Sequence, residues 1–244
     1  MFSRIAPRYD LLNSILSAGI DRRWRRAAAR EMSPASGGRH LDIATGTAEM
    51  ALEIFRQQGN SAFVACVVIS VEMMRIGRNK CAKAKADGRA FFVRAPGESL
   101  PFHNAVFDSA CVAFGIRNIA DISQGLGEMI RVVRPGGRIV VLEFSAPSGS
   151  IPDKLYNFYF TRVLPRIAAM MSPHRDAYKY LPDSVLSFPK PVQFEQMMRA
   201  AGCVSVTSRP LTAGIATLFL GIRRPVCGDR EQVSLSPAVP MSPD

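Results

Sequence analysis

The first place in this chain where a small molecule could bind is a glycine turn that follows an apolar run. The segment reads Leu41-Asp42-Ile43-Ala44-Thr45-Gly46-Thr47. Gly46 allows ligand atoms to touch the backbone, and Thr47 with the N–H groups that begin a helix can hold an anionic group. Alanine at positions 44 and 48 excludes the GxGxxG pattern, and the turn lacks the Gly-Lys-Ser/Thr ending of a phosphate-binding loop. Asp42, Gly46 and Thr47 are therefore predicted to bind a cofactor, the alternative being a turn with a structural role alone.

A second polar pair, Arg117-Asn118, follows a later apolar run at 106–113. In an open α/β sheet, ligands bind beyond the carboxyl ends of the strands, near the point where the strand order reverses. A cation and an amide at that edge could bind polar groups of a ligand. The alternative is that both side chains hold their own loop through hydrogen bonds to the backbone.

Strands alternate with helices along the chain, and this alternation predicts how the two turns are positioned. It indicates an α/β fold with a parallel sheet that is covered by helices on both faces. The short connection Leu211-Thr212-Ala213 makes the last two strands an antiparallel hairpin. The predicted strands are 39–44, 62–69, 89–94, 106–113, 138–144, 203–209 and 214–222, and the predicted helices are 48–57, 71–84, 123–133 and 192–201, with a turn at 135–137.

Three other regions are predicted around this sheet. Residues 1–36 are expected to form an N-terminal helical lid, and residues 37–224 the sheet domain. Residues 146–190 interrupt the alternation and are rich in proline and aromatic residues, which predicts a helical insertion. Residues 225–244 are rich in proline and serine, without periodicity, and are predicted to be disordered.

Length and composition are those of a globular protein. The chain has 244 residues, of which 48% are hydrophobic and 21% charged. Its longest apolar run, 62–69, is far shorter than the roughly 20 residues of a membrane span, and the charged N-terminus does not resemble a secretory signal. The five cysteines lie far apart without a CxxC or His-Cys spacing, so we expect no metal site and no disulfide framework, and a reducing, cytoplasmic location.

The chain is strongly basic, with a formal net charge of +11, and this predicts an anionic partner. Seven arginines lie between Arg4 and Arg30, and four of them surround Trp24. This segment is predicted to be either a solvated helix face or a surface that contacts an acidic membrane. Nucleic acid is not a predicted partner, because the sequence contains no helix-turn-helix, zinc-finger or RNP pattern.

Several segments taken together resemble one enzyme family. Their order and spacing are similar to those of class I S-adenosylmethionine-dependent methyltransferases, and more narrowly of the UbiE-type C-methyltransferases of ubiquinone and menaquinone biosynthesis. The resemblance covers roughly residues 1–224. The segments that carry it are 1–13, 19–25, 41–47, 100–102, 107–108, 113–118, 134–138, 142–145, 156–160, 177–185 and 211–215.

The resemblance implies a Rossmann-like seven-stranded sheet whose last strand is antiparallel, with S-adenosyl-L-methionine as methyl donor. It implies C-methylation of a polyprenylated quinol ring, either demethylmenaquinol to menaquinol or the corresponding ubiquinol precursor. Arg117 would then stabilise the quinolate, and Asn118 would position a hydroxyl. Because a prenyl tail stays in the bilayer, we expect a peripheral position on the inner face of the membrane. A homodimer is a further expectation.

Three departures from the family's pattern concern the predicted cofactor site. Ala48 stands where glycine is usual. Val68 stands where an acid usually ends the second strand and binds the ribose hydroxyls, and the lost contact is worth on the order of 1.5–3 kcal/mol. Glu72, in the next helix, is a candidate substitute. Pro96 and Gly97 stand where a polar residue and alanine are usual, near the adenine.

Alternatives therefore remain open at this stage. Val68 favours a non-catalytic methyltransferase-fold subunit of a quinone-biosynthesis complex. A methyltransferase with another small acceptor also fits, whereas the missing GxGxxG argues against a nicotinamide-binding protein. Tyr9 and Asp10 are candidates for closing the site. Within the insertion, the candidates for orienting the ring or acting as a base are Tyr178, Tyr180 and His174.

Overall fold

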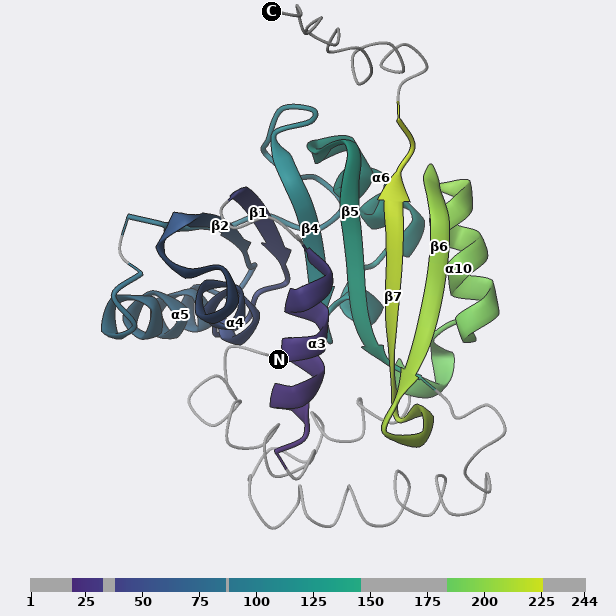
Figure 1. The fold of residues 1–244 in the computed structure, drawn as a ribbon, viewed down its shortest axis with the longest axis horizontal. Helices are drawn as coiled ribbons and strands as arrows, with labels where there is room; N and C mark the ends of the chain where they lie inside the picture. The colour runs from purple at the N-terminus through teal and green to yellow at the C-terminus, as the bar shows by residue number, and fades with distance from the viewer. Residues whose placement is uncertain (1–18, 33–37, 87, 146–183, 226–244) are drawn as a thin grey trace, which may run out of the picture.

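A computed structural model describes residues 19–32, 38–86, 88–145 and 184–225, and these form one seven-stranded sheet (Figure 1). The strand order is β3-β2-β1-β4-β5-β7-β6. The first five strands along the chain are parallel to one another, and β7 runs antiparallel to both β5 and β6. This confirms the predicted Rossmann-like methyltransferase sheet. The strands are β1 Gly38–Ile43, β2 Ala62–Val67, β3 Ala90–Val93, β4 Phe107–Ala113, β5 Val133–Phe144, β6 Cys203–Leu211 and β7 Ala216–Arg223.

Helices cover both faces of the sheet, and alternate strand residues fill two separate cores. In β4, for example, Cys111 faces one core and Val112 faces the other. Strands buried on both faces are near-continuous apolar runs, as a central parallel sheet requires. Three helices lie on one face of the sheet, namely α3 Asp21–Met32, α4 Glu49–Gln58 and α5 Val71–Lys83, and two lie on the other, namely α6 Ile122–Val132 and α10 Pro191–Ala200 (Figure 1). Short 3-10 turns occur at Gly59–Ser61, Ile116–Asn118 and Thr212–Gly214.

Helix α3 is fixed against the sheet by one aromatic side chain. Trp24 donates a hydrogen bond from Nε1 to Thr212 Oγ1 at 2.9 Å, and its ring contacts Phe114 and Phe144. The phenylalanine rings lie at the carboxyl ends of β4 and β5, so α3 packs beside the edge where ligands bind in this class of fold. Four of its arginines are exposed, namely Arg22, Arg23, Arg26 and Arg30.

The clearest difference from the sequence-based prediction is at 135–137, where a turn was expected. The structure instead continues β5 through this segment as an irregular bulge, in which Val133 pairs with Phe107 and Arg138 pairs with Ser109. Gly136 has φ 75°, and a Cβ at Gly137 would lie 2.6 Å from the Asp108 carbonyl oxygen. Only glycines permit this close backbone approach. The other predicted ends agree with the structure within two residues.

Several predictions concern residues outside the described ranges. They are the first part of the lid, most of the insertion at 146–190 and nearly all of the tail at 225–244, together with Tyr9, Asp10, His174, Tyr178 and Tyr180. The division into lid, insertion and tail therefore stays a prediction. Within the described ranges, no helix has both the length and the apolar character needed to cross a bilayer.

Candidate cofactor and substrate site

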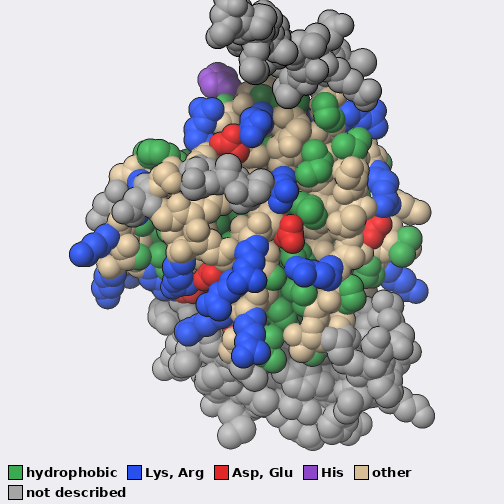
Figure 2. Space-filling model, in the orientation of Figure 1, with side chains coloured by type: hydrophobic (Ala, Val, Ile, Leu, Met, Phe, Trp, Pro, Cys, Tyr) green, Lys and Arg blue, Asp and Glu red, His purple; other side chains and the backbone are tan. Residues whose placement is uncertain are grey.

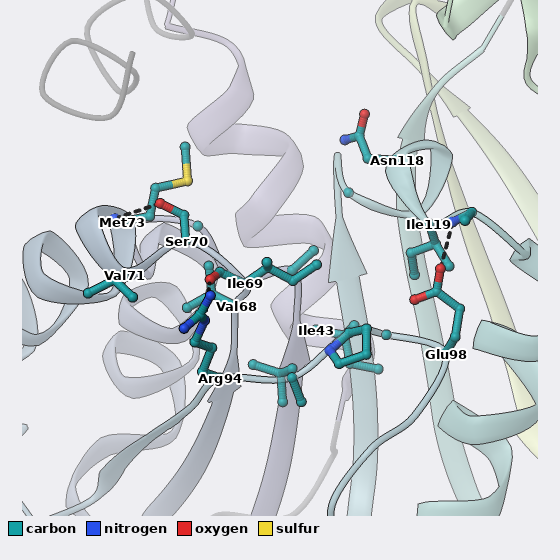
Figure 3. Close-up of a pocket in the computed structure, with 18 of the residues that line it drawn as sticks. Ile43, Val68, Ile69, Ser70, Val71, Met73, Arg94, Glu98, Asn118 and Ile119 are labelled. Carbon is teal, nitrogen blue, oxygen red and sulfur yellow. Dashed lines mark hydrogen bonds between the residues drawn. The ribbon is translucent and has the colours of Figure 1, made fainter. Parts of the chain in front are cut away.

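A cavity of about 580 Å³ opens at the carboxyl ends of β1, β2, β3 and β4. It lies where the strand order reverses between β1 and β4, the usual binding position in open α/β sheets. Figure 3 shows Val68, Ser70 and Met73 on one side of the cavity, and Asn118 and Ile119 on the other. Its volume is within the range of pockets that enclose small-molecule cofactors.

The glycine turn at the end of β1 is held in left-handed backbone conformations. The φ angles are 52° at Ala44, 57° at Gly46 and 68° at Ala48. Ala48 N–H donates to the Thr45 carbonyl at 2.9 Å, and Thr45 N–H donates to the Val67 carbonyl at 3.0 Å, which ties the turn to β2. A left-handed conformation costs an alanine about 1–2 kcal/mol. The turn therefore keeps its shape at a cost in stability, and Gly46 and Ala44 line the cavity.

Asp42 is fully buried beneath this turn. Its carboxylate accepts hydrogen bonds from the Thr45 hydroxyl and, at 3.6 Å, from the Cys111 thiol. Burial raises the pKa of Asp42 to about 6, although these bonds and the positive charge of Arg25 act in the opposite direction. Asp42 faces a small hollow that adjoins the cavity and that Arg25 and Thr47 also line. The position is suited to a cationic group of a ligand.

Arg25 and Lys80 are two basic residues at this turn that the sequence analysis did not place at the site; Arg25 was grouped there with the arginines around Trp24, and the structure buries it. Arg25 turns inward from α3, forms an ion pair with Asp21, and lies over the Phe114 ring at 5.3 Å. Lys80 Nζ donates to Thr47 Oγ1 at 3.2 Å and to Glu49 Oε1 at 2.6 Å, so α5 is connected to the start of α4. Neither position carries a sequence signal, because each is one basic residue among many.

Two glycines permit close packing around the cavity. A Cβ at Gly115 would lie 2.5 Å from Ala44 Cβ, where the loops after β1 and β4 meet. A Cβ at Gly97 would lie 2.7 Å from Ile119 Cδ1. The predicted residues Pro96 and Gly97 both line the cavity, and Gly97 has a clear steric reason to lack a side chain.

Arg117 and Asn118 have different surroundings although they are adjacent in sequence. Asn118 lines the cavity from the loop after β4 (Figure 3), whereas Arg117 is not among the described residues that line it. Arg117 forms a buried ion pair with Glu143, donates from Nη1 to the Phe114 carbonyl at 2.9 Å, and lies over the Phe144 ring at 5.5 Å. Its Nε is buried without a hydrogen-bond partner among the described residues. Glu143 was missed by sequence reasoning, although a charged residue in an otherwise apolar strand is a usable signal.

The part of the cavity next to β2 is apolar. Val68 lines it and packs against Met73, and Ile69 and Val71 are 62% and 52% exposed at its rim. The strand-end position that the family fills with an acid therefore offers no hydrogen-bond acceptor side chain. Two carboxylates, Glu72 and Glu98, are among the described residues that line the cavity.

The expected cofactor, S-adenosyl-L-methionine, fits the size and the place of this site. The cavity and the adjoining hollow together span from β3 to the glycine turn, and Asp42 supplies a negative charge near the turn. The polar contacts that the family pattern predicts at Val68 and Pro96 are missing. In size, in position and in the charge near the turn, the described residues fit this group.

Comparison with known sequences identifies the relatives of this chain. The profile of the ubiE/COQ5 methyltransferase family matches residues 1–223. A protein of Geobacter sulfurreducens named ubiquinone/menaquinone biosynthesis C-methyltransferase UbiE is 50% identical over 221 residues, which is 91% of this chain and 86% of that protein. A demethylmenaquinone methyltransferase of Deinococcus radiodurans is 45% identical over 224 residues, covering 92% of this chain and 91% of that protein.

Solved structures resemble this chain in fold at low sequence identity. A SAM-dependent methyltransferase from Aquifex aeolicus superposes with a TM-score of 0.60 at 13% identity, covering 81% of this chain and 88% of that chain. Haemonchus contortus phosphoethanolamine N-methyltransferase 2, in complex with S-adenosyl-L-methionine, gives 0.61 at 15% identity, covering 82% and 52%. The fold, the cavity at the switch point and the sequence relatives agree: this chain belongs to the ubiE/COQ5 methyltransferase family.

Proposed function

We propose that this protein methylates a ring carbon of a polyprenylated quinol, converting demethylmenaquinol to menaquinol. The proposal is supported by the names of relatives that are 44–50% identical over most of the chain. The single structural observation that carries it is the cavity at the β1/β4 switch point, lined by the glycine turn on one side and by Asn118 on the other. Methylation of the corresponding ubiquinol precursor is the second candidate, because several relatives are named for both quinones.

The residues after β4 have distinct roles in this proposal. A quinol ring becomes nucleophilic at carbon when a hydroxyl loses its proton, so the site must stabilise an oxyanion and hold the ring in line. Arg117 Nε is a buried donor that the ion pair with Glu143 leaves unused among the described residues. It is suited to the quinolate oxygen, and the Asn118 amide is suited to the second ring hydroxyl. Glu143 acts as a positioning residue that fixes the Arg117 guanidinium.

The cofactor side uses the residues around the glycine turn. S-adenosyl-L-methionine supplies the methyl group as a sulfonium. Asp42 offers a negative charge to a cationic group, while Gly46 and Thr47 bring the backbone and the start of α4 close to it. Val68, Pro96 and Gly97 form the wall that faces the adenosine, mainly through apolar and backbone contact.

We propose further that α3 contacts the inner face of an acidic membrane, where a prenyl tail is anchored. Figure 2 shows basic side chains gathered over α3. Arg22, Arg23, Arg26 and Arg30 are exposed there, whereas Arg25 is turned inward. Each exposed cation near an anionic lipid surface contributes about 1 kcal/mol to binding. A cytoplasmic, peripheral enzyme follows from this proposal. The homodimer also stays a prediction, which sedimentation analysis would test.

The test of the activity is product formation from short-chain quinols. The purified protein is supplied with S-adenosyl-L-methionine and a reduced demethylmenaquinol that carries a short prenyl chain, and the product is measured by mass spectrometry. We expect the mass of the ring to increase by one methylene. Asn118→Ala should lose this product, and the exposed control Asn79→Ala should keep it. Cofactor binding without methylation of either quinol would contradict the proposed substrate class.

The membrane contact has its own test. Binding to vesicles with and without anionic lipid is measured at increasing salt, and it should weaken as ionic strength rises. Changing the four exposed arginines of α3 to glutamine should abolish binding. The charge-matched control changes four exposed basic residues in and just after α5 to glutamine, namely Arg75, Arg78, Lys83 and Lys85. This control should still bind the anionic vesicles. Salt-independent partitioning would argue against this surface.

A further inference from the structure

The carboxyl end of β2 has lost its acid, but a carboxylate lies four residues further on. Val68 is buried in the cavity wall and packs against Met73, so position 68 contributes only apolar contact. Glu72 is in the first turn of α5 and lines the same cavity. The two vicinal ribose hydroxyls of an adenosyl ligand are hydrogen-bond donors, and they need an acceptor at this end of the cavity.

Ser70 holds the Glu72 side chain beside the start of α5. The Ser70 hydroxyl accepts a hydrogen bond from Met73 N–H at 3.3 Å, as a helix N-cap does, and donates one to Glu72 Oε2 at 2.9 Å. The carboxylate is thereby drawn back toward Ser70, which itself lines the cavity (Figure 3). An ionised carboxylate has about four lone-pair positions and can accept more than one hydrogen bond.

The other charged groups of the cavity are less suited to this task. Glu98 Oε1 accepts the Ala120 N–H at 2.6 Å, which places this carboxylate beside the loop after β4 (Figure 3). Arg94 lies near β2, where its Nε donates to the Ile69 carbonyl at 3.1 Å. A guanidinium has donors only and cannot accept a hydroxyl proton. Among the described lining residues, Glu72 is therefore the carboxylate on the β2 side.

We propose that Glu72, positioned by Ser70, binds the ribose hydroxyls of the methyl donor in place of the acid missing at Val68. This inference rests on the proposed function, because it takes the adenosyl cofactor as the ligand of the cavity. Glu72 is exposed to solvent, so the contact is weaker than one made by a buried strand-end acid. The protein accordingly binds its cofactor less tightly than a variant with both carboxylates.

The test is calorimetric binding of S-adenosylhomocysteine, a non-reactive cofactor analogue, and of its 2′-deoxy counterpart. Glu72→Gln should weaken binding of the full ribose by about 5- to 20-fold. The 2′-deoxy ligand should bind the wild type more weakly by a similar factor, and Glu72→Gln should then have little further effect on it. The thermal midpoint of the unliganded variant should fall by no more than about 2–4 °C, because the lost charge in the first turn of α5 costs at most about 1 kcal/mol, and this loss should not depend on the ligand used.

Ser70→Ala should weaken binding of the full ribose less than Glu72→Gln does, because Glu72 keeps its charge but is less restrained. Adding Val68→Asp to Glu72→Gln should restore binding of the full ribose and not of the 2′-deoxy ligand. If Glu72→Gln weakened the binding of both ligands by the same factor, the inference would be overturned. It would also be overturned if the wild type preferred a 2′-phosphorylated ligand, because this result would assign the ribose end of the cavity to Arg94. Absence of analogue binding to the folded wild type would instead overturn the cofactor itself.

Discussion

The carboxyl edge of the sheet has two halves with opposite character. At β1, β4 and β5, the charged groups are buried and paired: Asp42 accepts from Thr45, and Arg117 is in contact with Glu143. At β2 and β3, the wall is apolar, and its carboxylate, Glu72, is exposed. In the proposed function, the first half serves the methyl transfer and the second half the adenosine.

This difference separates two kinds of residue. A buried charge whose partner is removed costs both stability and function, because the remaining group cannot be solvated. An exposed group at a rim affects ligand affinity with little effect on folding. The comparison therefore predicts that substitutions at β4 and β5 change stability and turnover together, whereas substitutions at β2 change binding.

Arg117→Ala has the largest expected effect. Glu143, which is completely buried, would lose its cation, and the free energy of unfolding should fall by about 3–5 kcal/mol. Turnover should fall by about 100-fold or more, with affinity for S-adenosylhomocysteine nearly unchanged. Urea unfolding, single-turnover rates and calorimetry measure the three quantities.

A double variant keeps this prediction testable if the single one does not fold. Arg117→Met with Glu143→Leu removes both charges, and it should recover much of the stability without recovering turnover. Turnover at the wild-type rate in either variant would show that Arg117 serves only to hold its loop.

Restoring an acid at β2 is the reverse experiment. Val68→Asp should tighten cofactor binding by about 10- to 100-fold, because a carboxylate at the strand end accepts both ribose hydroxyls. Val192→Asp, at an exposed position of α10 that does not line the cavity, is the control and should leave affinity unchanged. Calorimetric titration measures both, and equal affinities in wild type and Val68→Asp would contradict our account of this half.

Asp42→Asn should raise the free energy of unfolding and lower the affinity for the cofactor. Burial raises the pKa of Asp42 from 3.8 to about 6, so between these values the folded state holds a proton that the unfolded state has lost. Stability contributed by this group is present below about pH 4, falls as pH rises through the window, and stays lost above about pH 6. The asparagine variant, which has no such charge, should gain at most about 3 kcal/mol at high pH.

The measurement is urea unfolding at pH 4 and pH 8, with cofactor binding measured alongside. The stability advantage of Asp42→Asn should be largest at pH 8 and disappear near pH 4, while its affinity for the cationic cofactor should be at least about 10-fold lower. A variant less stable than the wild type at pH 8 would mean that the bonds from Thr45 and Cys111 outweigh the cost of burial.

The smallest expected effect is at the glycine turn. Ala48→Gly removes a left-handed alanine but also a fully buried methyl group worth about 0.8 kcal/mol, so the free energy of unfolding should change by less than about 1 kcal/mol. Ala105→Gly, at φ 58° in an exposed loop, buries no such group and should raise it by about 1 kcal/mol. Thermal melting measures both. Only Ala48→Gly should also change cofactor affinity, and an identical binding change in both variants would exclude a specific role for the turn.

The sequence predicted local features of the site better than their partners. The glycine turn, the hairpin of β6 and β7, and the apolar position of Val68 follow from residue types and spacing, and the structure contains all three. The ion pair of Arg117 with Glu143 was not predictable, because it joins the turn after β4 to strand β5 across 26 residues of sequence. Nor was the inward turn of Arg25, which alone among the described arginines of α3 is buried.

The amino-acid sequence by itself determined the alternation of elements, the family, and the places of the glycine turn and the β6–β7 hairpin, because these depend on periodicity and on short-range backbone preferences. Only the tertiary structure decided which charges are buried and paired. The parallel order of β1, β4 and β5 brings Asp42 next to Cys111 and Glu143 next to Arg117. A charge far along the chain becomes a partner only when strand pairing places it within hydrogen-bond distance, and no local pattern encodes that contact.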